Sequence, residues 1–266
     1  MSSFFRSIGA ERLSRIPARL RDDARIIGLT RNWAEILSAK LSGKPLSRVV
    51  FRNGSVLEGP AEIDLLFLFH EIWLDKVYAR KGYEIRSGDK VLDIGGNIGA
   101  FALYAGNSAS DVSIDSYEPF PENAKFLKKN IETSKLKGVT IFQAAVAGEN
   151  GEQFLRVDDS WVKHSLSDNA EGRGIKVETI ALDKIVEEMG RCDLLKVDCE
   201  GGEYEIFYNA APETLRKIDR IVCEYHDVPG RTGEELKRFF EANSFRVDLF
   251  EAFDETTGVL FVTNQR

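Results

Sequence analysis

The chain has 266 residues, of which 43% are apolar and 30% charged, enough apolar material for one large domain or two small ones. Its formal net charge of −7 disfavours a general nucleic-acid-binding surface, and no uninterrupted apolar run has the length of a membrane-spanning helix. Three cysteines without Cys-x-x-Cys spacing exclude a disulfide scaffold and a zinc ribbon, so we expect a reducing, cytoplasmic location.

The N-terminal segment 1–50 is basic, in contrast to the rest of the chain. It contains ten Lys or Arg and four Asp or Glu, a net charge of +6, so the remaining residues carry −13. Phe5, Ile8, Ile16 and Leu20 are interleaved at roughly helical spacing. The pattern predicts an amphipathic helix that either makes peripheral contact with an anionic membrane surface or packs as a solvated helix on the main domain.

Residues 1–80 are predicted to form a mainly helical N-terminal extension or cap, ahead of a larger domain at 81–266. Within it, residues 48–56 alternate in polarity around an Asn-Gly turn signal, which predicts a short β-hairpin. The apolar-rich stretch 63–78 predicts a helix.

Short apolar runs alternate with helical patterns after residue 88. We expect strands at 90–94, 112–117, 139–146, 192–198, 221–225, 247–253 and 259–263. We expect helices at 101–109, 121–135, 183–189, from about 203, and at 234–242. This alternation predicts an α/β fold with a largely parallel sheet covered on both faces. The last two strands leave no room for a crossover helix, so they should form an antiparallel hairpin, as in the Rossmann-like methyltransferase type.

The glycine-rich turn after the first of these strands discriminates between cofactors. Residues 93–99 read Asp-Ile-Gly-Gly-Asn-Ile-Gly, whereas a dinucleotide fingerprint starting at Gly95 needs glycines at positions 97 and 100. The chain has Asn97 and Ala100 at these positions, which argues against an NAD-type dehydrogenase. S-adenosylmethionine has no phosphates and therefore fits this turn better.

Several residues near this turn are candidates for holding the donor. Asp93 offers a carboxylate to the cationic end of S-adenosylmethionine, and Gly95 and Gly99 allow close approach of the backbone. Glu118 follows the second strand, where an acidic residue accepts both ribose hydroxyls in NAD sites as well. Ala145 belongs to a small-residue run on which an adenine ring could lie. The alternatives are a solvated carboxylate for Glu118 and simple core packing for Ala145.

A second polar cluster is predicted at the ends of the fourth and fifth strands. Asp198 and Glu200 are two residues apart, as are Glu224 and His226, so each pair leaves one strand face. Transfer of a methyl group to oxygen needs a positioned hydroxyl and usually a base. His226 and Asp198 are the candidate bases, because His titrates near neutral pH and burial can raise the pKa of a carboxyl group.

The same carboxylates allow two other interpretations. Asp198, Glu200 and Glu224 offer oxygen ligands to Mg²⁺, which would lower the pKa of a bound hydroxyl. Alternatively, Lys196 pairs with a carboxylate in a structural network. For Glu203 we expect a structural role at the N-terminus of the following helix.

The polar segment 158–174 is a candidate substrate loop. Trp161 could stack on a sugar face, and His164 could bind or deprotonate a hydroxyl, with Glu224 as a further acceptor-binding residue. The alternative is a surface loop in which Trp161 is anchored on the core.

Three motifs belong together: residues 93–99, residues 117–119 (Tyr-Glu-Pro) and residues 195–203 (Leu-Lys-Val-Asp-Cys-Glu-Gly-Gly-Glu), along with Asn130 and residues 224–226. This set resembles the FkbM family of S-adenosylmethionine-dependent methyltransferases. The resemblance covers about residues 65–263, with Glu71 and Tyr78 similar to that family's lead-in helix. It implies O-methylation of hydroxyls on sugars, glycans, lipids or polyketide products. It also implies that Asp198 and Glu200 lie on the active-site floor. Gly96 and Gly202 stand where the family usually has alanine.

Together these arguments predict an S-adenosylmethionine-dependent O-methyltransferase that acts on a hydroxyl of a sugar, glycan, lipid or secondary metabolite. The alternatives are an N- or carboxyl-methyltransferase on a small molecule and a cofactor-binding module without turnover. The predicted catalytic residues are Asp198, His226 and Glu200. The predicted donor site comprises Asp93, Gly95, Gly96, Asn97, Gly99, Glu118 and Ala145, and the predicted acceptor site comprises Trp161, His164 and Glu224.

Overall fold

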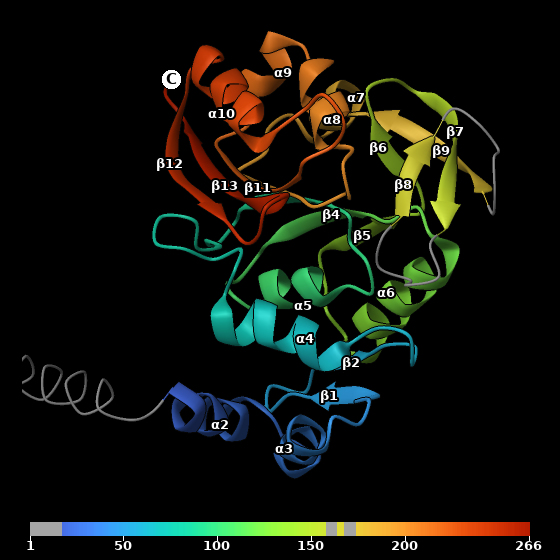
Figure 1. Ribbon diagram of the computed structural model, residues 1–266, viewed down its shortest axis with the longest axis vertical. Coiled ribbons are helices and arrows are strands. Elements are labelled where there is room, and N and C mark those ends of the chain that lie inside the picture. The colour runs from blue at the N-terminus through green and yellow to red at the C-terminus, as the bar shows by residue number, and fades with distance from the viewer. Residues whose placement is uncertain (1–17, 158–163, 168–173) are drawn as a thin grey trace, which may run out of the picture.

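The computed structural model describes residues 18–157, 164–167 and 174–266 (Figure 1). Its centre is a seven-stranded sheet in the order β12-β13-β11-β10-β3-β4-β5. The strands are β3 (Lys90–Ile94), β4 (Ser113–Tyr117), β5 (Val139–Phe142), β10 (Leu194–Val197), β11 (Arg220–His226), β12 (Phe245–Ala252) and β13 (Thr257–Asn264). β3, β4, β5, β10 and β11 are parallel, whereas β12 and β13 are antiparallel at one edge. The predicted α/β fold with a C-terminal antiparallel hairpin is therefore confirmed.

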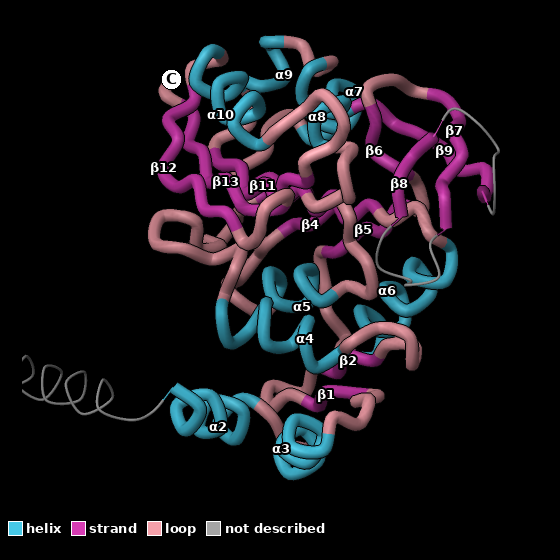
Figure 2. Tube along the Cα trace, in the orientation of Figure 1, coloured by secondary structure: helices cyan, strands magenta, loops and turns pink. Residues whose placement is uncertain are grey.

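Helices cover both faces of this sheet, as Figure 2 shows. Adjacent residues of β3 point to opposite faces, so Val91 joins one core cluster and Leu92 the other. The first face is covered by α5 (Ala100–Gly106) and α6 (Pro121–Thr133). The second face is covered by α7 (Leu182–Met189), α8 (Glu203–Tyr208), α9 (Pro212–Arg216) and α10 (Gly233–Ala242). Burial on both faces explains why the central strands are continuous apolar runs.

The predicted strand 139–146 is confirmed over 139–142 as β5, but the chain leaves the central sheet after Phe142, so the second half of the prediction is corrected. The carbonyl of Phe142 accepts the N–H of Glu118, and the chain then turns. Ala145–Ala147 (β6) pairs instead with β9 (Gly174–Ala181) in a second sheet of order β6-β9-β7-β8. This sheet also contains β7 (Gly151–Val157) and β8 (His164–Ser167). Most of the predicted loop 158–174 lies outside the described residues, but its described parts belong to strands.

The N-terminal part consists of helices and one hairpin, as predicted. It comprises α2 (Ala18–Leu29), α3 (Trp33–Ser42), β1 (Arg48–Val50), β2 (Val56–Glu58), α4 (Leu65–Phe69) and a π-helix, η1 (His70–Asp75). Phe51 packs against Phe69 and Trp73, and Ile26 is buried in the same cluster as Val91. The extension therefore shares the core on the α5 face, and a domain boundary near residue 80 stays a prediction.

Asn130 near the end of α6 links the β1–β2 hairpin to the glycine turn after β3. Its amide donates to the carbonyls of Glu58 and Ile98 at 2.8 Å each, and its side-chain oxygen accepts the N–H of Glu58. Across the described residues, we find no helix that is long and apolar enough to cross a membrane.

Candidate active site

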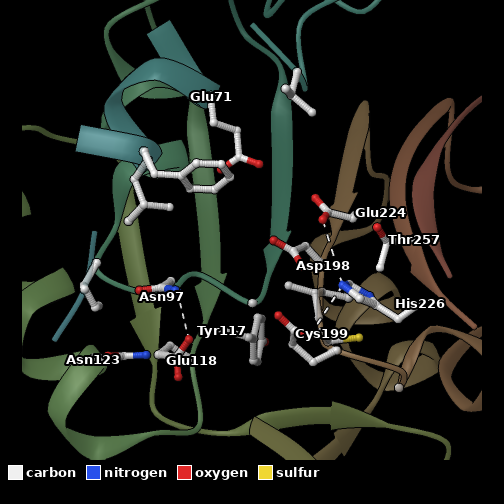
Figure 3. Close-up of a pocket in the computed structure, with 18 of the residues that line it drawn as sticks. Glu71, Asn97, Tyr117, Glu118, Asn123, Asp198, Cys199, Glu224, His226 and Thr257 are labelled. Atoms are coloured by element: carbon white, nitrogen blue, oxygen red, sulfur yellow. Dashed lines mark hydrogen bonds and ion pairs between the residues drawn. The ribbon is translucent and has the colours of Figure 1, made fainter. Parts of the chain in front are cut away.

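A cavity of about 550 Å³ opens at the carboxyl ends of β3, β4, β10 and β11 (Figure 3). α4 and η1 form one wall, and the turn between β12 and β13 contributes to the rim. The carboxyl edge of a parallel sheet is the usual ligand position in such folds. Two groups of polar residues lie at different ends of this single cavity, and we describe them in turn.

Glu118 is the central residue of the first end. It lies directly after β4 and is 5% exposed. Its two oxygens accept the backbone N–H groups of Asn97 at 2.7 Å and Phe120 at 2.8 Å. Burial raises the pKa of Glu118 to about 7, although both N–H donors favour the ionised form. The predicted residues Gly95, Asn97, Glu118 and Ala145 all line the cavity.

Asn123 is a cavity-lining residue that the sequence analysis missed. It lies in the first turn of α6, is 2% exposed, and faces the same end as Glu118. Its side-chain oxygen has no hydrogen-bond partner in the part of the chain that the structure describes. A buried polar atom without a partner is costly, so this oxygen marks a position for a ligand donor. The signal in the sequence was the polar residue in the first turn after the Tyr-Glu-Pro motif.

Asp93 does not face the cavity, which corrects its predicted role beside the cationic end of the donor. Its side chain is fully buried below the glycine turn, where it accepts Ser116 Oγ at 2.7 Å. Lys196 Nζ lies 3.5 Å from Asp93 and donates to the carbonyl of Gly95 at 2.7 Å. Asp93 therefore supports the turn through Lys196. It is the last residue but one of β3, so its side chain points into the core instead of into the cavity.

Close packing inside the protein, more than contact with a ligand, is the reason for glycine at these positions of the turn. Gly95 has φ of +79°, and a Cβ on it would lie 1.8 Å from the carbonyl oxygen of Asp198. A Cβ on Gly96 or Gly99 would lie 2.4 Å from Ser116 Oγ or 2.5 Å from Leu127 Cδ1. Gly96 and Gly99 are absent from the cavity lining, which corrects their assignment to direct donor contact.

The second end of the cavity contains two carboxylates that share one hydroxyl. Tyr78 Oη lies 2.8 Å from Glu224 Oε2 and 3.1 Å from Asp198 Oδ2. The hydroxyl has one proton, so it donates to one carboxylate at a time. Burial and the charge of Asp198 raise the pKa of Glu224 above its usual value. Tyr78 comes from the segment after η1 and was given no role in the sequence analysis.

His226 is held between carboxylates. Its Nδ1 lies 3.1 Å from Glu203 and its Nε2 lies 3.4 Å from Glu200. Burial opposes protonation, but the hydrogen bond and charge of Glu203 prevail and raise the pKa of His226 to about 9. His226 therefore keeps its proton at neutral pH, which removes the reason for assigning it as the base. Glu203 also accepts the N–H groups of Cys199 and Gly201 ahead of α8, in line with the structural role expected for it.

Lys196 forms the ion-paired network that was one of the alternatives. Its ammonium is 3% exposed and lies 3.7 Å from Asp198 and 3.5 Å from Asp93. It also lies 5.5 Å from the centre of the Tyr78 ring. One buried cation thus contacts both the glycine turn and the carboxylate of Asp198 at the second end.

Glu71 is a further lining residue that was given no role. It lies in the π-helix η1 and points into the cavity above the other acidic residues (Figure 3). Burial, and next the charge of Asp198, raise the pKa of Glu71 to about 7. Its signals in the sequence were an acidic residue within an apolar stretch and the resemblance of this stretch to the family's lead-in helix.

Asp198, Glu224 and His226 each offer one ligand atom, and these atoms lie within 4.8 Å of one another. Glu200, which the sequence analysis included in a Mg²⁺ site, is outside that group, although it lines the cavity. Of the other predicted acceptor residues, Trp161 lies outside the described residues. His164 begins β8, and its side chain is likewise outside the description.

Comparisons with known proteins identify a family and several similar chains. The family model described as the methyltransferase FkbM domain matches residues 93–247. The chain is 28% identical over 217 residues to the 31-O-demethyl-FK506 methyltransferase FkbM of Streptomyces tacrolimicus, covering 68% of this chain and 82% of that protein. It is 27% identical over 217 residues to Methyltransferase 1 of Beauveria bassiana, covering 73% and 86%. Fibrillarin of Aeropyrum pernix, solved with S-adenosyl-L-methionine, aligns over 68% of each chain with 10% identity and a TM-score of 0.44.

The matched region contains the strand ends that form the cavity floor. It begins at Asp93 and includes Glu118, Asp198 and His226, whereas Tyr78 precedes it. The match extends over more than half of the chain. The chain therefore belongs to the FkbM family of S-adenosylmethionine-dependent methyltransferases.

Proposed function

We propose that this chain transfers the methyl group of S-adenosylmethionine to a hydroxyl oxygen of a sugar, glycan, lipid or secondary metabolite. The observation that carries the proposal is the division of one cavity into two chemically different ends. One end holds the buried carboxylate of Glu118, and the other holds the paired carboxylates of Asp198 and Glu224. A relative named for a 31-O-demethyl compound supports oxygen as the methylated atom.

Glu118 and Asn123 are the proposed contacts to the adenosine part of the donor. Each oxygen of Glu118 already accepts one backbone N–H and retains a further lone pair for a ribose hydroxyl. Asn123 offers its unpartnered side-chain oxygen at the same end. Ala145 leaves room for the adenine ring because its side chain is small.

Asp198 and Glu224 are the proposed groups that receive the hydroxyl proton. S-adenosylmethionine supplies an electrophilic methyl group when bound. The acceptor oxygen forms a bond to that carbon while the carbon–sulfur bond breaks, and the sulfur keeps the electron pair. The hydroxyl proton passes to an ionised carboxylate, and Glu224 accepts it only in its ionised form, in which its raised pKa makes it a stronger base than an ordinary carboxylate. Tyr78 acts as a positioning residue, because its hydroxyl contacts both carboxylates.

A divalent cation such as Mg²⁺ is a second way to activate the hydroxyl. Asp198, Glu224 and His226 have the ligand types and spacing for one. Lys196, however, already places a positive charge 3.7 Å from Asp198, which weakens the attraction for a second cation. Treatment with a chelator distinguishes the two routes. Full turnover without divalent ions supports the carboxylate route, and turnover that returns only with Mg²⁺ supports the cation.

The test of the proposed function uses methyl-labelled S-adenosylmethionine with a panel of hydroxyl acceptors and their amine and carboxyl analogues. We expect an O-methylated product. Glu224→Gln should lower turnover about 10²–10⁴-fold with unchanged affinity for S-adenosylhomocysteine. Glu188→Gln, an exposed position on α7, is the matched control and should keep full turnover. A product methylated on nitrogen or a carboxyl group would contradict the proposal, and donor binding without any turnover would indicate a binding module.

A further inference from the structure

Exposed large apolar side chains are concentrated on the two N-terminal helices. Seven such side chains occur among the described residues, and four of them lie on α2 and α3. Their exposed fractions are 57% for Leu20, 40% for Ile27, 39% for Trp33 and 71% for Leu41. Isolated exposed apolar residues are ordinary, but four within 22 residues of the chain are a concentration that needs an explanation.

On each helix the exposed apolar residues are distinct from those that are buried in the core. Leu20 and Ile27 are seven residues apart, which places them on one face of α2, whereas Ile26 is fully buried. Trp33 and Leu41 are eight residues apart on α3, whose buried residues are Ile36 and Ala39. Packing against the main domain therefore does not account for the exposed side chains.

The charge around these helices is positive, opposite to that of the whole chain. Residues 18–52 contain eight Lys or Arg and three Asp or Glu. Asp22 and Asp23 already pair with Arg25 and Lys40 inside the unit, at 3.9 Å and 2.9 Å. Five basic side chains have no acidic partner within ion-pair distance in the described parts of the chain: Arg21, Arg31, Lys44, Arg48 and Arg52.

We propose that the face formed by α2 and α3 docks on an anionic lipid bilayer. Leu20, Ile27, Trp33 and Leu41 would enter the boundary between headgroups and acyl chains, and the unpaired cations would contact the headgroups. The net charge of −13 on residues 51–266 repels the main domain from such a surface, so the basic face is the one presented. Figure 1 shows both helices at one end of the molecule, away from the central sheet.

Charge also argues against the two other occupants of this face. In a two-fold symmetric dimer, a second copy of the chain would bring the same basic face against it. Residues 1–17 carry three Arg and one Glu, so they too are net positive. An anionic lipid surface is the occupant whose charge is complementary to the face.

The test is flotation of the full chain with vesicles of phosphatidylcholine mixed with phosphatidylserine, against vesicles of phosphatidylcholine alone. We expect co-flotation only with the anionic vesicles and release by salt, because screening weakens surface electrostatics. Trp33→Gln with Leu41→Gln should reduce the bound fraction at least about tenfold. The matched control is Tyr208→Gln, which removes an exposed aromatic residue on α8 and should not change binding.

Three results would overturn the proposal. The first is absence of binding to the anionic vesicles, and the second is binding that the double variant leaves unchanged. The third is a lipid-free dimer, in sedimentation velocity, that the double variant dissociates, which would assign the face to a second copy. Equal thermal unfolding midpoints for wild type and variants show that the variants are folded. Affinity for S-adenosylhomocysteine is measured in parallel, so failure of docking is distinguished from failure of the proposed function.

Discussion

The affinity for S-adenosylhomocysteine should rise with pH because of Glu118. In the ligand-free protein, burial raises the pKa of Glu118 to about 7. The proposed ribose contacts need the ionised carboxylate, since a carboxylate accepts hydrogen bonds at both oxygens. Binding therefore favours loss of the Glu118 proton. The affinity is lower at pH values at which Glu118 is protonated in the ligand-free protein.

The magnitude follows from the ionised fraction of Glu118. With a pKa of about 7, roughly one tenth of the free protein is ionised at pH 6 and roughly nine tenths at pH 8. The association constant should therefore increase about tenfold between these pH values, equivalent to about 1.4 kcal/mol. One proton should be released per ligand bound below the pKa.

Isothermal titration calorimetry at pH 6, 7 and 8 measures this change, and buffers of different ionisation enthalpy count the released proton. Glu118→Gln should bind more weakly, by about 1–3 kcal/mol at pH 8, and should lose the pH dependence. Glu71→Gln is the matched control, because Glu71 has a similarly raised pKa but is not assigned to the ribose. An equal pH dependence in wild type and Glu118→Gln would refute the reasoning, as would affinity that falls as the pH rises.

Three further predictions concern the stability of the site. Lys196→Met leaves Asp93 buried without its cation and should lower the free energy of unfolding by about 3–5 kcal/mol in urea titrations; a loss below about 1 kcal/mol would contradict this. Gly95→Ala places a Cβ 1.8 Å from the carbonyl oxygen of Asp198 at a φ of +79°, so it should cost about 1–3 kcal/mol of unfolding free energy and weaken ligand binding; wild-type values for both would be inconsistent with the contact. The pKa of His226 is about 9 in the folded protein, against 6.5 in the unfolded chain, so its protonated ring stabilises the fold fully below pH 6.5. This stabilisation is lost as the pH rises through 9, and the urea midpoints of wild type should decline accordingly. The midpoints of His226→Gln should lack this decline, and an unchanged decline would argue against the ion pairs.

Local sequence patterns predicted the parts of the site that lie within one strand and its following turn. The run at 93–99 ends β3 in a glycine turn, and Glu118 follows β4 directly, so their meeting depends only on the parallel sheet. Asp198 and Glu224 converge for the same reason, as ends of adjacent strands. These placements needed no information about helices elsewhere in the chain.

The remaining site residues depend on packing over long sequence distances. Glu71 lines the cavity because α4 and η1 cover the sheet, and Tyr78, after η1, meets Glu224 across 146 positions. The protonation of His226 was misjudged because Glu203, 23 positions earlier, faces its ring. The spacing of residues along one strand does not predict the contact of Tyr78 with Glu224 or that of Glu203 with His226. The alternation of residues 174–181 is typical of a strand, but the sequence analysis assigned no element there and so missed β9.

The contact between Gly95 and Asp198 has a consequence for changing what this protein methylates. The two residues come from different motifs, yet the space between them excludes even one methyl group. The motif that contains Gly95 and the motif that contains Asp198 therefore have to be changed together in any redesign of the cavity floor. The rim is built differently, since Phe67 on α4 and Phe253 after β12 are 60% and 44% exposed and belong to separate elements. Substitutions meant to change acceptor preference should therefore be made at the rim, with the floor left unchanged.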